Sequence, residues 1–433
     1  MSINIIIYIL VTAGVAGIIK YREIINPYTL FNILWIVVLM LIDNGNYYID
    51  PPSETALNCI ILGVISYNCS MLIPLARFKI RKVRNSDNIG EYKINYNLAL
   101  KFSNISVVVC TLLSVQPLVR FLSGSNFGII RTDYYTYGNF LEYFLWYARL
   151  YTISASRDVI FIIALFAFIT NYKSKFRLLF NAIMLIILES VMSGGRYVLM
   201  NAGFMIFCFY LRYSDKVRLK RKQKIMIGGT LITFFGLIIF FTSNRVTYLY
   251  SRLSALELIQ QTFYGYFAGS VTYLGRLITT YSADMGTTYG VNFMQGFILP
   301  IFTLFGFVGI STPEVINKVG NLTVKPLAIS AVATLNALPT VFGYFYVDGK
   351  MTAVIIESFL FGYICKKIYS RSTRNNTIYF AAYLLLVTQI LNTSTKWFFY
   401  QSDYCFAFLY LFLFFRRKEF NDEKNVKNVI DQA

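Results

Sequence analysis

Arginines beside the apolar segments are the residues whose chemistry is most distinctive in this chain. From Arg120 to Arg276, the basic residues expected at the outer face of a membrane are all arginine, whereas the loops of the opposite face mix lysine and arginine. A guanidinium presents a planar fork that grips phosphate or carboxylate at two points, and it keeps its proton. This asymmetry predicts an anionic, phosphate-bearing ligand that arrives from the outer leaflet. The arginines concerned are Arg120, Arg131, Arg149, Arg157, Arg196, Arg245, Arg252 and Arg276.

One of these arginines follows a turn that allows close approach. In Ser193-Gly194-Gly195-Arg196, two glycines join two apolar segments and direct a single charge at the membrane interface. A charge at such a turn is costly unless it has a partner. We therefore interpret Arg196 as functional, and Arg245, which directly follows a span end, is expected to face the same site. Arg120 and Arg149 lie near span ends and fit interfacial anchors that reach lipid headgroups.

Carboxylates near these arginines are few. Glu189 lies near the outer end of an apolar span, just before the glycine turn, and an acid inside the membrane is a functional candidate. The alternative is a simple pair with Arg196. Asp348 lies where a long loop re-enters the membrane, and it is a candidate general base, with a structural salt bridge as the alternative. Glu357 and Asp403 also fall inside expected spans, but no motif beside them indicates a role.

Tyrosines are dense in the same outer segments. They could stack on sugar rings, and the alternative for each one alone is an interfacial aromatic belt. As a group, among arginines and glycines, they favour a carbohydrate surface. They are Tyr134, Tyr135, Tyr137, Tyr248, Tyr250, Tyr264, Tyr266, Tyr273, Tyr281 and Tyr289.

The composition excludes several kinds of site. The chain has no histidine, which excludes a histidine base, a Ser/His pair and a histidine metal site. No metal cluster or cofactor motif is visible. The six cysteines all lie in apolar segments and indicate no disulfide framework. The net charge of +19 comes from basic runs in short loops beside apolar spans, so we expect no nucleic-acid binding.

The elements that must position these residues are membrane helices. Of the 433 residues, 56% are hydrophobic and 14% are charged, against about 25% in soluble domains. This predicts an all-α polytopic integral membrane protein. Apolar length and loop charge indicate about 11 transmembrane spans, or about 13 if 297–310 and 326–347 also cross, with the N-terminus outside and the C-terminus cytoplasmic. Ile3–Ile19 reads as the first span, because no basic region precedes it and no small-residue cleavage site follows it.

The spans divide the chain into four parts. Residues 1–243 are expected to form an N-terminal bundle of about 8 spans with an outer segment at 121–151. Residues 244–350 form a large extracytoplasmic loop, with re-entrant helices as one reading of its apolar stretches. About 3 spans follow in 351–418, and 419–433 is a cytoplasmic tail.

The chain resembles the O-antigen and capsule polymerase family, the oligosaccharide repeat-unit polymerases of bacterial envelopes. The resemblance rests on the Ser193–Arg196 turn, the large outer loop, and the run from Asn336 to Gly349 that leads into an apolar helix with a late glycine, Gly362. The match is partial, because Asp348 and Gly349 are adjacent here without the aromatic residue that separates them in the family. The arginine-to-glycine spacing of some members is also not reproduced.

The resemblance implies a GT-C-like glycosyltransferase in the bacterial cytoplasmic membrane. A growing glycan on undecaprenyl diphosphate would be moved onto a new lipid-linked repeat unit at the outer face, without a metal. The implied partners are the undecaprenyl-diphosphate-linked oligosaccharide, membrane lipids, and a chain-length regulator and flippase of the same pathway. The alternatives are a lipid-linked oligosaccharide flippase or other transporter, another lipid-phosphate glycosyltransferase, and an accessory envelope protein. The related ligase is disfavoured because it relies on a histidine.

Two sets of residues follow from these arguments. The expected catalytic residues are Arg196, Arg245, Asp348 and Arg276. The expected substrate-binding residues are Arg131, Arg157, Arg252, Glu189, Asn336, Asp284, Tyr264 and Tyr289.

Overall fold

The structure is a computed structural model that describes most of the chain. The residues that it describes are 3–45, 49–74, 92–125, 129–130, 140–213, 228–230, 232–234, 236–240, 255–306, 311–331, 333–335, 338–372 and 376–417.

Helices make up nearly all of the regular structure in this part of the chain, as the composition predicts for an all-α membrane protein. Five described helices are long and apolar enough to cross a membrane, the fourth being a continuous run of three labelled pieces. They are α1 (Ile3–Tyr21), α2 (Pro27–Asn44), α4 (Tyr96–Leu122), the run α6–η1–α7 (Phe140–Arg149, Leu150–Ser154, Ala155–Ile169) and α8 (Lys175–Ser193). Other bundle helices are α3 (Glu54–Cys69), α9 (Tyr197–Tyr213), α14 (Thr340–Arg371), α15 (Thr377–Leu391) and α16 (Ser402–Phe414).

Local sequence explains where several of these helices begin and end. The side chain of Asn26 caps α2 by accepting the N–H groups of Tyr28 and Thr29, and Pro27 supplies a preset first position. At the other end of a helix, α8 stops at Gly194, which has a left-handed φ of +55°. Glycine tolerates this conformation and lets the chain turn at once into α9.

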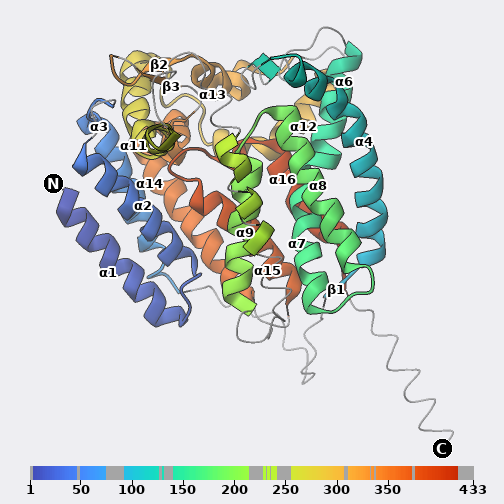
Figure 1. The fold of residues 1–433 in the computed structure, drawn as a ribbon. Coiled ribbons are helices and arrows are strands. Elements are labelled where there is room, and N and C mark those ends of the chain that lie inside the picture. The colour runs from blue at the N-terminus through green and yellow to red at the C-terminus, as the bar shows by residue number, and fades with distance from the viewer. Residues whose placement is uncertain are drawn as a thin grey trace, which may run out of the picture.

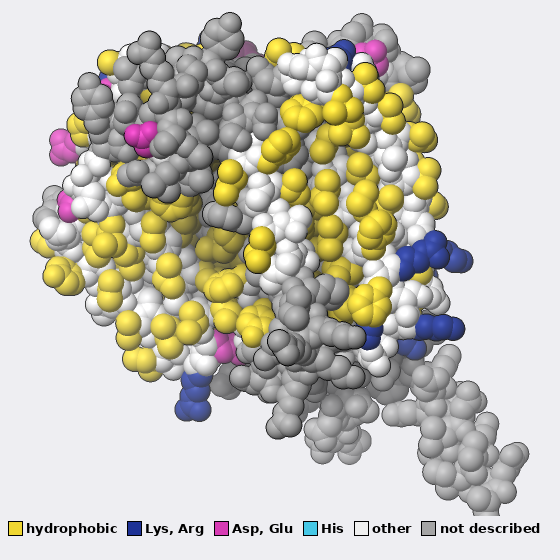
Figure 2. Space-filling model, viewed as in Figure 1, with side chains coloured by type: hydrophobic (Ala, Val, Ile, Leu, Met, Phe, Trp, Pro, Cys, Tyr) yellow, Lys and Arg dark blue, Asp and Glu magenta, His cyan; other side chains and the backbone are white. Residues whose placement is uncertain are grey.

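The bundle has a buried centre and an apolar rim. Helices α7 and α15 are buried on almost all sides, whereas α1 and α4 lie at the two edges of the view in Figure 1 and expose apolar side chains. Tyr8 of α1 is 73% exposed and Leu112 of α4 is 70% exposed. The hydrophobic surface in Figure 2 runs over the whole middle of this face. A helix that is apolar toward both protein and solvent belongs in lipid.

The helix ends that carry basic residues meet at one end of the bundle. There β1 (Tyr92–Ile94) pairs antiparallel with β4 (Phe415–Arg417), and Arg212 at the end of α9 pairs with Glu23 after α1. Most Lys and Arg side chains in Figure 2 lie in the lower half of the molecule, at this end. The gathering agrees with the predicted loop charges, and the sidedness itself stays a prediction.

The long loop expected between residues 244 and 350 is largely helical where the structure describes it. It forms a layer over the other end of the bundle (Figure 1). Helix α11 (Ala255–Thr280) packs against α2 and α3, and its residues Val271, Tyr273 and Leu274 are fully buried. The remaining elements are η2 (Ser282–Asp284), η3 (Asn292–Met294), α12 (Gln295–Gly306), α13 (Glu314–Val324), β2 (Leu327–Ala328) and β3 (Thr334–Leu335).

Helix α14 is broken where this layer meets the bundle. Lys350 has a left-handed φ of +55°, so the carbonyl groups just before it lose their helical partners. The N–H groups of Gly286 and Thr287 bond to the freed carbonyl of Val347, and the N–H of Tyr289 bonds to that of Asp348. The break is therefore supported by a dedicated turn, which satisfies backbone groups that would be costly to leave bare.

Candidate functional site

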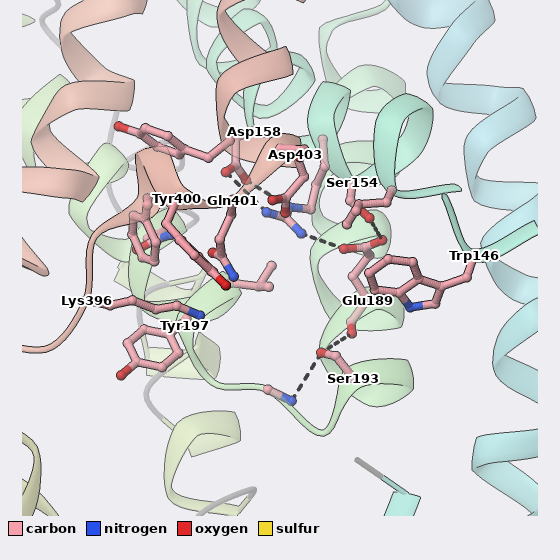
Figure 3. Close-up of a pocket in the computed structure, with 18 of the residues that line it drawn as sticks. Trp146, Ser154, Asp158, Glu189, Ser193, Tyr197, Lys396, Tyr400, Gln401 and Asp403 are labelled. Atoms are coloured by element: carbon pink, nitrogen blue, oxygen red, sulfur yellow. Dashed lines mark hydrogen bonds and ion pairs between the residues drawn. The ribbon is translucent and has the colours of Figure 1, made fainter. Parts of the chain in front are cut away.

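A cavity of about 250 Å³ lies inside the bundle, toward the end that carries the helical layer. Helices α6, α7, α8, α9, α12 and α16 all contribute to its wall, which mixes aromatic rings with charged groups (Figure 3). The lining residues are Trp146, Tyr147, Leu150, Ser154, Arg157, Asp158, Glu189, Ser193, Gly195, Tyr197, Val198, Asn201, Leu299, Lys396, Phe398, Tyr400, Gln401, Ser402, Asp403 and Tyr404.

A buried ion-pair cluster forms one side of the cavity. The Nε and Nη2 atoms of Arg157 donate to the two carboxylate oxygens of Asp158 at 2.8 and 3.2 Å, and Nη1 donates to Oε2 of Glu189 at 2.6 Å. The hydroxyl of Ser154 donates to Oε1 of Glu189 at 2.6 Å. All three charged side chains are less than a tenth exposed. Charges this deep persist only when they are paired, and these are paired at good geometry.

The cluster depends on the way α6 passes into α7. Between them the chain makes one π-helical turn, η1, which interrupts the regular α-helical register. Ser154 at the end of this turn and Arg157 one turn later both face α8, where they meet Glu189. The sequence predicts that Glu189 lies inside the membrane near the end of a span, and the structure buries it near the end of α8. Its partner is Arg157, and Arg196 is bonded elsewhere.

Asp403 enters the cavity from the first turn of α16. Its carboxylate lines the same cavity as Arg157. Among the described residues it forms no ion pair. Figure 3 shows Asp158, Glu189 and Asp403 pointing toward the same part of the cavity.

The loop before α16 is held by a buried polar turn, Asn392–Lys396. The Nδ2 of Asn392 donates to Oδ1 of Asn201 at 3.0 Å, and the Nε1 of Trp35 donates to Oγ1 of Thr393 at 3.2 Å. Ser270 of α11 donates its hydroxyl to the carbonyl of Ser394 at 2.6 Å. Three helices are thereby tied to one turn, which fixes Lys396 and the start of α16 against the cavity.

The glycine turn borders the cavity as well. Ser193 donates its hydroxyl to the carbonyl of Glu189 at 2.7 Å and accepts the N–H of Gly195 at 3.2 Å. Arg196 is 9% exposed, is not part of the lining and points to α11. Its Nη2 donates to the hydroxyl of Tyr266, and its guanidinium carbon lies 4.8 Å from the centre of that ring. The stacked contact holds the guanidinium plane in one orientation.

Aromatic rings supply the remaining wall. Trp146 and Tyr147 come from α6, Tyr197 starts α9, and Tyr400 precedes α16. Tyr197 also lies edge-on to Tyr266, with ring centres 6.0 Å apart, so the aromatic wall continues to the residue on which Arg196 stacks. Flat apolar faces beside carboxylates suit a ligand that has both C–H and hydroxyl groups.

The structure brings Arg157 and Glu189 together in the cavity, but most other predicted residues lie apart from it. Arg276 pairs with Asp50 at 2.8 Å, and Asp284 pairs with Lys318 at 3.2 Å, both near the surface. Tyr264 is half-buried on α11 and Tyr289 is 86% exposed, whereas Arg131, Arg245, Arg252 and Asn336 lie outside the described residues.

Asp348 is buried at the break in α14, away from the cavity lining. Its carboxylate accepts the backbone N–H groups of Asn292 and Phe293, each at 3.0 Å, and the side chains of Asn292 and Thr288. It thus caps the start of η3 and α12, where an anion is favoured. Burial raises the pKa of the Asp348 carboxyl, and the hydrogen bonds oppose this. Glu357 is buried further along α14, and its Oε2 has no hydrogen-bond partner among the described residues.

Sequence reasoning missed the contribution of the last loop. This stretch contributes Lys396, Gln401 and Asp403 to the cavity. Hydropathy alone assigns it to the ends of two spans and the loop that connects them. The run Asn392-Thr393-Ser394-Thr395-Lys396 was the available signal, since a polar run between apolar segments must find hydrogen bonds somewhere. The sequence favours a salt bridge to an arginine for carboxylates of these outer segments, and Asp158 forms one with its neighbour Arg157.

No described group of three or more His, Cys, Asp or Glu side chains is arranged to hold a metal ion. Comparisons with models of known protein families, with curated proteins and with solved structures found no match. The chemistry of the cavity and of the turn beside it is therefore the ground for a functional conclusion.

Proposed function

We propose that this chain is a repeat-unit polymerase. It transfers a growing glycan from undecaprenyl diphosphate to the non-reducing end of a new lipid-linked repeat unit, at the outer face of the bacterial cytoplasmic membrane, with a GT-C-like arrangement of helices. The observation that carries the proposal is a cavity with aromatic and carboxylate walls inside a lipid-facing bundle, bordered by a glycine turn that presents Arg196.

The position of the cavity suits a reactant that is part sugar and part lipid. Apolar helix surfaces keep the lipid chain in the bilayer, while the cavity offers rings and carboxylates for the sugar. The cavity lies toward the end opposite the basic helix ends, which is the outer side under the loop-charge rule. A lipid-linked sugar could therefore reach it without leaving the membrane.

Arg196 supports the chemistry of the leaving group. Glycosyl transfer from a lipid diphosphate develops negative charge on the departing phosphate, and a preset guanidinium stabilises that charge in the transition state. Stacking on Tyr266 presets the guanidinium, and the left-handed Gly194 places the turn beside the cavity. The arginine needs no proton transfer to act, because it stays charged.

The test is the surface glycan of a strain that lacks this chain. A product limited to one repeat unit supports a polymerase, and restoring the gene should restore the ladder. Arg196→Lys keeps the charge but loses the fork, and should cost roughly 2–4 kcal/mol of transition-state stabilisation, or about 10²–10³ in rate. A full ladder from this variant at matched membrane level would remove Arg196 from the mechanism.

A second candidate function, a flippase or transporter for lipid-linked oligosaccharide, is favoured by one feature. Transporters often use broken helices, and polar residues inside their spans bind and couple ions. The break in α14 at Lys350, with Asp348 and Glu357 both buried on this helix, is of this kind. Loss of all surface glycan, with carrier-linked repeat units accumulating inside the cell, would assign the chain to transport.

A further inference from the structure

The cavity and the Arg196 turn differ in charge. This difference distinguishes the part of the substrate that would bind in the cavity from the part that would bind beside Arg196. The described lining contains two cationic side chains, Arg157 and Lys396, and three carboxylates, Asp158, Glu189 and Asp403. Arg157 already donates three hydrogen bonds to two of those carboxylates. The guanidinium in the cavity is therefore neutralised within the protein. An incoming phosphate would meet an excess of negative charge, at a site where like charges repel strongly.

We infer that the cavity is the acceptor subsite and takes a single terminal sugar that is uncharged or carries an amino group, with Asp403 accepting the proton of its attacking hydroxyl. This inference rests on the polymerase proposal and deepens it. It assigns the diphosphate to the side of Arg196 and excludes uronic acids from the cavity. A volume of about 250 Å³ has room for one sugar ring and not for a whole repeat unit.

The three carboxylates are not equivalent, and this selects Asp403. Both oxygens of Asp158 and one oxygen of Glu189 accept Arg157 donors, and the other oxygen of Glu189 accepts Ser154. These acceptors are occupied. Asp403 lines the cavity and forms no ion pair with another described residue, so its carboxylate retains acceptor capacity toward the cavity (Figure 3).

The reaction balances without a further reactant. The hydroxyl oxygen of the acceptor sugar forms a bond to the anomeric carbon of the donor glycan, and the bond from that carbon to the diphosphate oxygen breaks. The proton of the hydroxyl passes to the Asp403 carboxylate, and undecaprenyl diphosphate leaves with the electron pair. Arg157 keeps Asp158 and Glu189 in place through its ion pairs with both.

Sugar class can be measured without any polymer being made. Trp146 lines the cavity, while Trp35 and Trp397 are buried at 0% and 1% exposure, so tryptophan emission of the purified full-length protein reports on the cavity. The probes are the methyl glycosides of glucose, glucosamine and glucuronic acid. We expect the glucosaminide to bind about tenfold more tightly than the glucuronide, which is about 1.4 kcal/mol, with the glucoside between them. Trp146→Phe should abolish the change in emission that the sugars cause.

Asp403→Asn should reduce the preference for the amino sugar. Equal or tighter binding of the glucuronide would overturn the inference, and so would emission that none of the three probes changes. If the protein selects sugars as expected but its membranes make no polymer, the polymerase proposal is rejected. The inference about the class of sugar that binds in the cavity would still hold.

The base is tested in membranes that carry the full chain and its own lipid-linked repeat unit. Asp403→Asn should lower kcat by about 10²–10⁴ with little change in KM, and Asp403→Glu should restore part of the rate. Glu314→Gln, at an exposed carboxylate of α13, is the matched control and should behave like the wild type. Wild-type turnover by Asp403→Asn, or equal loss in the Asn and Glu variants, would remove Asp403 from the chemistry.

Discussion

Arg157 is the residue whose removal should damage the folded bundle most, and the structure predicts by how much. Arg157→Met deletes three hydrogen bonds and leaves Asp158 and Glu189 buried without a cation. Breaking a buried ion pair from one side costs roughly 3–5 kcal/mol, because an uncompensated charge remains. Glu189→Gln is milder: Arg157 keeps both bonds to Asp158, and the Gln carbonyl still accepts one donor. Its expected cost is about 1–2 kcal/mol, near that of one charged hydrogen bond.

The double variant separates the ion pair from simple loss of packing. With both Arg157→Met and Glu189→Gln, one of the stranded charges is gone, so the double variant should be more stable than Arg157→Met alone. A coupling of about 0.5–3 kcal/mol is expected for groups in direct contact. The measurement is the fraction of detergent-purified protein that stays monodisperse after heating, at matched membrane levels. A single Arg157→Met variant that survives heating like the wild type would refute the reasoning, as would a double variant weaker than both single variants.

Three further predictions concern other parts of the fold. Asp348→Asn should destabilise the chain, because an amide donor would face the N–H of Phe293, and heat stability of the purified variant measures this; wild-type stability would argue against the cap. Gly362→Ala should weaken the contact of α14 with α3, because the new methyl would lie 2.6 Å from the carbonyl oxygen of Tyr67. The control is Gly203→Ala, whose methyl would meet no atom within 4 Å. Equal melting temperatures of the two variants would contradict this prediction. Single cysteines in a cysteine-free background should react with an impermeant maleimide only on the outer side, and the reverse pattern would invert the topology. The positions expected to react are Ser123, Ser251 and Thr279, and the position expected to stay unlabelled is Ser214.

The helices of the first half were predictable because lipid and protein both demand apolar faces there. Hydropathy locates α1, α2 and α4, and errors of a few residues arise where capping decides the ends, as at Asn26. The layer formed by residues 255–348 was read as a loop, because its apolar residues alternate with arginines and glycines. In the structure those residues pack on protein: Tyr273 of α11 is fully buried.

The candidate site was predictable in part. Glu189 could be found because an acid inside an apolar span needs a reason, and the glycine turn because its spacing is unusual. The partnership of Arg157 with Asp158 and the entry of Asp403 depend on the π-helical turn of η1 and on the polar turn that holds the start of α16. Hydropathy predicts neither feature, because both depend on hydrogen bonds between segments that are distant in the sequence.

The central place of α15 has a consequence for how the protein is made. This helix packs against α2, α9 and α14, yet the ribosome delivers it after all of them. Until the turn at Asn392–Lys396 emerges, Trp35, Asn201 and Ser270 have no access to the partners they hold in the finished bundle. The early helices must therefore insert into the bilayer before these polar groups have the hydrogen-bond partners that the turn supplies. We therefore expect chains that end before residue 376 to be degraded faster than the full-length chain.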